Sequence, residues 1–278
     1  MALMAGSYIA FIFFTGDWHI YGIYFRYLLS ILFLALAGRA FVRVKKLPFW
    51  KKSNPREKFG YYFISFFSLF FLALTGWAVW GQSFSAEPVS LQFPLKQGRY
   101  FVMEGGDSPL INQRFHTNPP TPKKYAIGIG KVFGSGRRAS GLFPENPEAY
   151  AVYGTEVFSP CNGIVREKVD SLANLNEADS LSEMQMLGNY ITIQSGDLQI
   201  TLSQLQMGSI PVEIGDSISI GQPVGSVGNS GEAPEPLLLI FATRKNHDAF
   251  WRQYFDREGV PMLFNERFLT KNSIFDAP

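Results

Sequence analysis

The sequence predicts a mainly β, antiparallel domain that follows two or three transmembrane helices. Two long apolar runs fill most of the N-terminal third, and the rest consists of short alternating runs separated by Gly, Asn and Pro. At 278 residues the chain has room for one sizeable domain and a membrane anchor. The hydrophobic fraction of 46%, the charged fraction of 17% and the 26 Phe residues are unusual for a purely soluble protein.

The two apolar runs predict helices over residues 20–42 and 59–80. The first run is interrupted only by Arg26 and Arg39, and the second carries no charge. A bilayer core about 30 Å thick needs roughly 20 apolar helical residues, and both runs are long enough. Residues 2–15 are also apolar but too short to span comfortably, so we expect either a partial first helix or an interfacial segment.

The segment between the runs predicts the topology. Residues 43–58 (RVKKLPFWKKSNPREK) carry seven Lys and Arg residues against a single acid, Glu57. Short loops rich in Lys and Arg stay in the cytoplasm, so the loop is expected inside and the chain after residue 82 outside. We therefore expect a transmembrane anchor over residues 1–82, a linker over 83–97 and an extracytoplasmic domain over 98–278. The membrane is the first expected partner, and the net charge of +2 favours no nucleic-acid partner.

Period-two alternation and turn residues predict the strands of the domain. Residues 170–185 form a polar, acidic insertion, for which we expect a surface loop or a short helix. The predicted strands are Gly98–Met103, Tyr125–Phe133, Thr155–Ser159, Gly163–Val169, Asn189–Gln194, Gln199–Gln204, Ser217–Ile220, Pro223–Val227 and Leu237–Thr243.

Residues 187–242 carry the most informative pattern. They contain a GNY strand, a second strand ending in SQLQMGSI, a GDSISIGQPVG hairpin, a VGNSG turn and an apolar strand after Glu235-Pro236. In order and spacing this stretch resembles the catalytic core of the lysostaphin/LytM-type zinc metallopeptidases, which cut peptide cross-links in bacterial cell walls. LINQRF, KKYAIGI and VGNSGEAPEP also match, so the resemblance covers about residues 110–272. It implies the peptidoglycan-endopeptidase fold known as the duplicated hybrid motif.

The resemblance also implies where zinc ligands and catalytic histidines belong. The family has a histidine in the LINQRF region, an aspartate after Tyr-Ala-x, a histidine on the second strand and a His-x-His pair on the last. These metal-ligand positions fall on Gln113 or Arg114, Gly128 and Leu239, and the auxiliary histidine positions fall on Gln204 and Leu237. A catalytic zinc needs three protein ligands and one open position. The sequence therefore predicts a degenerate member with no catalytic residue, no bound metal and no other cofactor.

The three histidines do not rebuild this site. His19 lies beside a membrane segment, and His247 follows the last predicted strand in a KNHD turn, where we expect a solvated residue. His116 lies two or three positions beyond the expected ligand and is the candidate for a displaced one. One histidine cannot supply the three ligands of a catalytic zinc site.

Other reactive groups also favour structural roles. The single cysteine, Cys161, excludes an internal disulfide and is expected as a small buried residue. The pair Arg137-Arg138 could bind an anionic partner, but a solvated pair is the commoner case. A biotinyl or lipoyl carrier domain shares the hairpin pattern but needs a lysine at the hairpin tip, and no lysine occurs between Lys168 and Lys245.

Apolar residues replace the histidines of the last strand. Because side chains alternate along a strand, Leu237, Leu239 and Phe241 are expected to face the former active site, where they would form an apolar groove floor and an interface. Leu238 and Ile240 would then face the core.

The predicted function is that of a pseudopeptidase in the bacterial inner or cytoplasmic membrane, with a non-catalytic binding or regulatory role in the cell envelope. Its expected partners are a cell-wall hydrolase, an envelope protein or a peptidoglycan peptide. One alternative is an active zinc metalloendopeptidase that cleaves peptidoglycan peptides through atypical ligands. The other is a structural module whose membrane helices carry the function.

Overall fold

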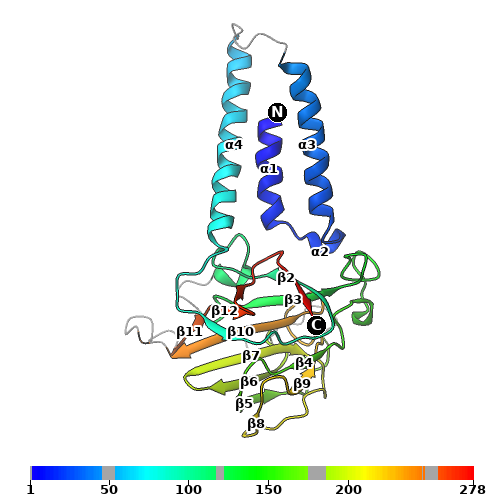
Figure 1. The fold of residues 1–278 in the computed structure, drawn as a ribbon, viewed down its shortest axis with the longest axis vertical. Helices are drawn as coiled ribbons and strands as arrows, with labels where there is room; N and C mark the ends of the chain where they lie inside the picture. Colours follow the sequence, from blue (N-terminus) through cyan, green and yellow to red (C-terminus); the bar gives the residue numbers. More distant parts are fainter. Residues whose placement is uncertain (1, 46–53, 117–121, 175–185, 246, 248–255) are drawn as a thin grey trace.

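A computed structural model describes residues 2–45, 54–116, 122–174, 186–245, 247 and 256–278. Helices at the N-terminal end stand side by side on one end of a β domain (Figure 1). The helices are α1 (Ala2–Thr15), α2 (Trp18–Tyr21), α3 (Phe25–Val44) and α4 (Pro55–Trp80). By length and composition, α3 and α4 could each cross a membrane.

The helix boundaries differ from the predicted runs for local reasons. The first run is divided because Gly22 has a φ of 113°, so α2 ends there and α3 begins at Phe25. Helix α4 begins before the apolar run, because Asn54 and Glu57 form a capping box in which each side chain accepts the other's backbone N–H. The last four residues of the predicted 43–58 loop therefore belong to α4.

The domain consists of short strands and two 3₁₀ turns, and the predicted strands are present with shifted ends. They are β1 (Val89–Leu91), β2 (Gly98–Glu104), β3 (Ile127–Val132), β4 (Glu156–Phe158), β5 (Gly163–Val169), β6 (Asn189–Ser195), β7 (Leu198–Leu205), β8 (Ser217–Ile218), β9 (Pro223–Ser226), β10 (Leu238–Lys245), β11 (Arg257–Val260), β12 (Met262–Phe264), β13 (Arg267–Phe268) and β14 (Ile274–Ala277), with η1 (Gln113–His116) and η2 (Pro147–Ala149). The main sheet has the order β14-β2-β3-β10-β7-β6-β5-β8, and β11 pairs with β10. Its pairings are antiparallel, which confirms the predicted fold class.

Two predictions about this region are corrected. The GDSISIGQPVG segment is not a hairpin, because β8 pairs with β5 and β9 pairs with β4. The segment 83–97 is not only a linker, because β1 lies inside it and pairs in parallel with β12. The acidic insertion predicted over residues 170–185 lies mostly outside the described residues.

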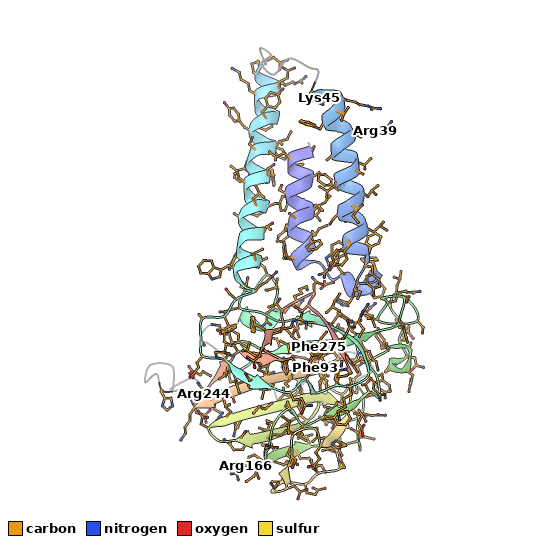
Figure 2. The ribbon with its side chains drawn as sticks, in the orientation of Figure 1. Arg39, Lys45, Phe93, Arg166, Arg244 and Phe275 are labelled. Atoms are coloured by element: carbon orange, nitrogen blue, oxygen red, sulfur yellow. The ribbon has the colours of Figure 1, made fainter. Side chains whose placement is uncertain are left out.

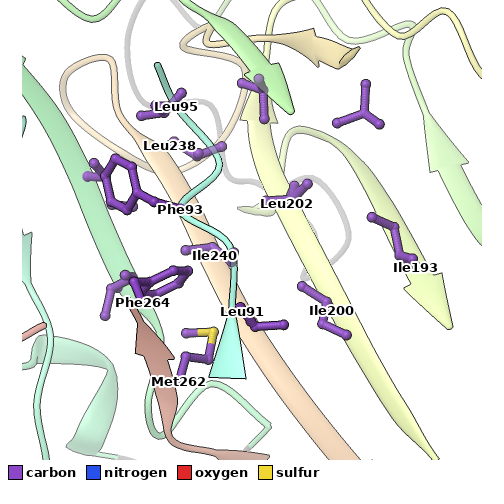
Figure 3. Close-up of a cluster of buried hydrophobic side chains, with 14 of the residues drawn as sticks. Leu91, Phe93, Leu95, Ile193, Ile200, Leu202, Leu238, Ile240, Met262 and Phe264 are labelled. Atoms are coloured by element: carbon purple, nitrogen blue, oxygen red, sulfur yellow. The ribbon is translucent and has the colours of Figure 1, made fainter. Parts of the chain in front are cut away.

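The hydrophobic core explains why the segment after α4 joins the domain. Leu91, Phe93 and Leu95 are buried against Leu238 and Ile240 of the main sheet (Figure 3). Burial of each large apolar side chain contributes about 1.5–3 kcal/mol, so these residues hold the segment in place. Phe93 also stacks on Phe275, with ring centroids 4.1 Å apart, and the two side chains lie together inside the domain in Figure 2.

Hydrogen bonds and an ion pair, in addition to the chain connection, hold the domain against the helices. The Asn272 side chain donates to the carbonyl oxygens of Phe14 and Gly16, both at 3.1 Å. The ammonium of Lys271 lies 2.6 Å from a carboxylate oxygen of Asp17. The end of α1 and the residues before α2 therefore contact the domain directly.

Candidate functional site

The positions that the resemblance implies for metal and catalysis converge in the fold. Gly128 on β3 and Leu239 on β10 are register partners. Leu239 also pairs with Ser203 on β7, the residue before Gln204. Gln113 and Arg114 from η1 line one cavity together with Leu237, which directly precedes β10. The fold thus brings these positions together, and the chemistry available there depends on the side chains that occupy them.

The strand positions are filled by packing and backbone contacts. A Cβ added at Gly128 would lie 3.2 Å from Cγ of Glu104 and 3.5 Å from Cδ2 of Leu237, so neighbouring side chains occupy that space. Gln204 is fully buried, and its side-chain oxygen accepts from the backbone N–H of Gly231 at 2.9 Å. This glutamine fixes the turn after β9 and presents no free group to the cavity.

Arg114 places a permanent cation at this site. Its Nε donates to Glu104 at 2.8 Å, and its Nη1 donates to Glu232. Burial lowers the pKa of the guanidinium, but the charges and hydrogen bonds of the two carboxylates outweigh that effect and raise the pKa overall. A guanidinium offers only donors and no lone pair for a metal. The carboxylates of Glu104 and Glu232 therefore pair with the guanidinium of Arg114 rather than with a metal ion.

The residues at these positions do not fit a zinc ion. Gly128 and Leu239 have no side-chain donor atom, and the first position falls on Gln113 or Arg114. The guanidinium of Arg114 has no lone pair and occupies the nearby carboxylates, and one amide of Gln113 cannot supply the three ligands of a catalytic zinc. Within the described ranges, no group of three or more His, Cys, Asp or Glu side chains could hold a metal. His116 ends η1, but its side chain lies outside the described part, and His247 is exposed, as expected.

The predicted apolar groove floor is corrected by its burial. Leu237, Leu239 and Phe241 form a cluster with Ala126 and Ala233, separate from the main core that contains Leu238 and Ile240. The predicted alternation is therefore present. However, Leu239 is fully buried and Phe241 is 7% exposed, because residues beside the strand cover them. Of the three, Leu237 alone lines the cavity, so these residues do not form an open apolar floor.

Comparison with known proteins identifies the domain. The model of Peptidase family M23 matches residues 148–250. These residues form an M23 domain. None of the curated proteins matches the chain.

Solved structures with similar folds include several peptidases. The catalytic domain of the antimicrobial peptidase lysostaphin from Staphylococcus simulans is 20% identical over 34% of this chain and 63% of its own, with a TM-score of 0.26. A zinc-containing peptidase from Vibrio cholerae is 15% identical over 69% of this chain and 41% of its own, with a TM-score of 0.32. Csd3 from Helicobacter pylori is 13% identical over 56% of this chain and 30% of its own, with a TM-score of 0.28. The chain spans less than two thirds of the length of each.

The β domain and α2 together carry a second ionic cluster, which the sequence did not reveal. Arg138 is buried, and its Nε donates to Glu235 at 2.6 Å, so it is not the solvated residue expected from the Arg137-Arg138 pair. The imidazole Nε2 of His19, from α2, lies 3.4 Å from the other oxygen of Glu235, and its ring stacks on Phe101. His19 therefore reaches from the helices into the site.

The resulting cavity lies between α2 and the β domain and has a volume of about 750 Å³. Asp17 and His19 line the helix side, and the two ionic clusters line the domain side. Tyr150, at its edge, has a raised pKa because of burial and the nearby charge of Glu235. Such a mixed lining can hold a polar peptide through hydrogen bonds and charge pairs, but it offers no activated nucleophile.

Proposed function

We propose that this chain is a membrane-anchored, extracytoplasmic pseudopeptidase of the LytM/lysostaphin type with a non-catalytic role in the bacterial cell envelope. One observation carries the proposal: the first ligand position that the resemblance implies falls on Gln113 or Arg114, and the guanidinium of Arg114 is held there by Glu104 and Glu232. Gly128 and Leu239, at the other two ligand positions, add no donor atom.

The missing ligands remove the chemistry on which peptide hydrolysis by such enzymes depends. A catalytic zinc polarises the scissile carbonyl and lowers the pKa of its bound water towards 7. A guanidinium paired with two carboxylates cannot activate water in this way. The cavity keeps hydrogen-bonding groups and charges, which suits binding of a peptidoglycan peptide, or of a segment of a cell-wall hydrolase or another envelope protein.

The helices support the proposed location. Arg39 and Lys45 lie towards the end of α3 that points away from the β domain (Figure 2). The basic segment that begins at Arg43 continues from there. Because Lys and Arg mark the cytoplasmic side, this arrangement supports a location of the domain outside the cytoplasmic membrane.

Incubation of the full chain in detergent with purified peptidoglycan, and separately with glycine-rich cross-link peptides, tests this function. We expect no new peptide termini in either case, with or without added zinc, while peptidoglycan or an envelope protein is retained by the immobilised chain. The matched control is Lys168→Met, which removes an ion pair with Glu213 in which neither residue lines the cavity. Cleavage that is lost with a chelator and in His116→Ala would show an active enzyme instead.

A further inference from the structure

A loop of the β domain lies against the point where α2 passes into α3. This loop, residues 133–145, follows β3, and Figure 1 shows the green segment after β3 beside α2. The backbone N–H of Ile23 donates to the carbonyl of Gly136 at 2.9 Å, and Arg138 donates to the carbonyl of Ile20 at 3.4 Å. A Cβ added at Gly136 would lie 2.6 Å from the ring of Tyr24, so the contact is close.

The 133–145 loop exposes large apolar side chains. Phe133 is 45% exposed, Leu142 51% and Phe143 72%. Single exposed apolar residues are normal on any protein, and Ile220 elsewhere in the domain is one of them. The loop differs because three such residues occur within one short segment that contacts the start of a candidate membrane span.

The helix ends define the expected level of the membrane surface. Helix α3 begins and α4 ends on the domain side, at Phe25 and Trp80. Exposed aromatic residues gather there, with Tyr21 at 62% and Trp80 at 78%. Tyr and Trp are enriched where a membrane meets water. Phe143 lines the same cavity as Asp17 and Ile20 from the α1–α3 connection, so the loop lies beside this level.

We propose that the 133–145 loop enters the lipid leaflet next to the domain, with Phe133, Leu142 and Phe143 at the boundary between headgroups and acyl chains. The partner is the lipid bilayer itself. Apolar side chains of interfacial segments lie about 5–10 Å into that boundary, while basic residues interact with anionic headgroups. The exposed Arg137 of the same loop suits the second role. The inference rests on the proposed membrane anchoring.

The contact would also orient the cavity. Phe143 and Pro144 belong to its wall, so a loop seated in lipid holds that wall at the membrane surface. A ligand would then approach along the membrane rather than from the bulk of the envelope.

Fluorescence quenching of the full chain in liposomes tests the inference. A Cys161→Ser background carries one new cysteine, Phe143→Cys, labelled with an environment-sensitive dye. The liposomes contain phosphatidylethanolamine and phosphatidylglycerol, with spin-labelled lipids as quenchers. The matched control is Ile220→Cys, which is 48% exposed and follows β8 at the end of the domain opposite the helices (Figure 1). A dye at Leu32→Cys, on α3, reports the span itself.

We expect the dye at position 143 to lose fluorescence to spin-labelled lipid, most strongly when the label lies near the headgroup, and to resist aqueous iodide. The dye at position 220 should behave in the opposite way. Quenching at position 32 but not at position 143 would overturn the loop insertion, leave the anchoring intact and favour a protein as the partner of the loop. Loss of quenching at both positions would overturn the anchoring as well.

Discussion

At the scale of single residues, the proposed absence of zinc depends chiefly on the guanidinium of Arg114. The side chains of Arg114 and Glu104 are 13% and 12% exposed, and Glu232 is 31% exposed. Removing the cation would leave two partly buried carboxylates close together. The cluster is therefore expected to contribute to stability as well as to exclude a metal.

We predict that Arg114→Met lowers the free energy of unfolding by about 3 kcal/mol, because a buried charge loses its partner. The matched change Lys168→Met removes a pair whose acidic partner, Glu213, is 75% exposed, and should cost about 0–1 kcal/mol. Urea unfolding of the full chain in detergent, followed by circular dichroism, measures both. Equal effects of the two substitutions would show that the Arg114 cluster adds nothing beyond a surface pair.

Cys161 gives a prediction that depends on pH. Cys161 is only partly buried, and this burial raises the pKa of its thiol from 9.0 to about 11, so the thiolate is disfavoured in the folded chain. Stability is unaffected by this group below pH 9 and falls as the pH rises towards 11, because only the unfolded chain ionises readily there. The native thiol should react with a disulfide reagent more slowly at pH 8 than the thiol in urea. Equal rates would contradict the burial.

The sequence located the positions of this site but not all of its side-chain contacts. Gly128, Leu239 and Gln204 were found because each sits at a fixed place in a recognisable strand or turn. The cluster of His19, Arg138 and Glu235 was missed, because its members lie far apart in the chain and belong to no shared pattern. Only the docking of α2 on the domain brings them together.

At the scale of elements, period-two alternation predicted the strands well and their partners poorly. Strands β5 to β7 lie where expected, since alternation marks one buried face. The β8–β9 segment was misjudged as a hairpin, because a Gly-containing turn between short strands does not specify which strand each will pair with. The short strand β1 was missed because it pairs in parallel with the distant β12, which leaves no local signal.

A comparison of two glycines distinguishes the cost of a left-handed backbone from the cost of a steric clash. Gly188 and Gly196 have φ values of 67° and 62°, but only at Gly188 would a Cβ meet backbone atoms, 2.6 Å from the nitrogen of Gly231. We predict that Gly196→Ala costs about 1–2 kcal/mol for the left-handed backbone alone. Gly188→Ala should cost clearly more, because it also displaces the turn fixed by Gln204. Thermal unfolding of both variants measures this difference, and equal losses would exclude the clash.

At the scale of the whole molecule, the helices and the β domain face each other across an ionic cavity. The proposed topology predicts that an impermeant maleimide added to intact cells labels Ile220→Cys, an exposed position after β8, but not Ser53→Cys, in the basic segment. Both variants need Cys161→Ser. Labelling at position 53 alone would reverse the orientation.

The central claim is the proposal that the family's ligand positions in this chain hold no zinc. Elemental analysis of the purified full chain, after incubation with zinc and removal of the unbound ion, tests this most directly. We predict clearly less than one zinc per chain. The zinc content of His116→Ala should equal that of the unmodified chain. One tightly bound zinc per chain, lost in His116→Ala, would contradict the claim.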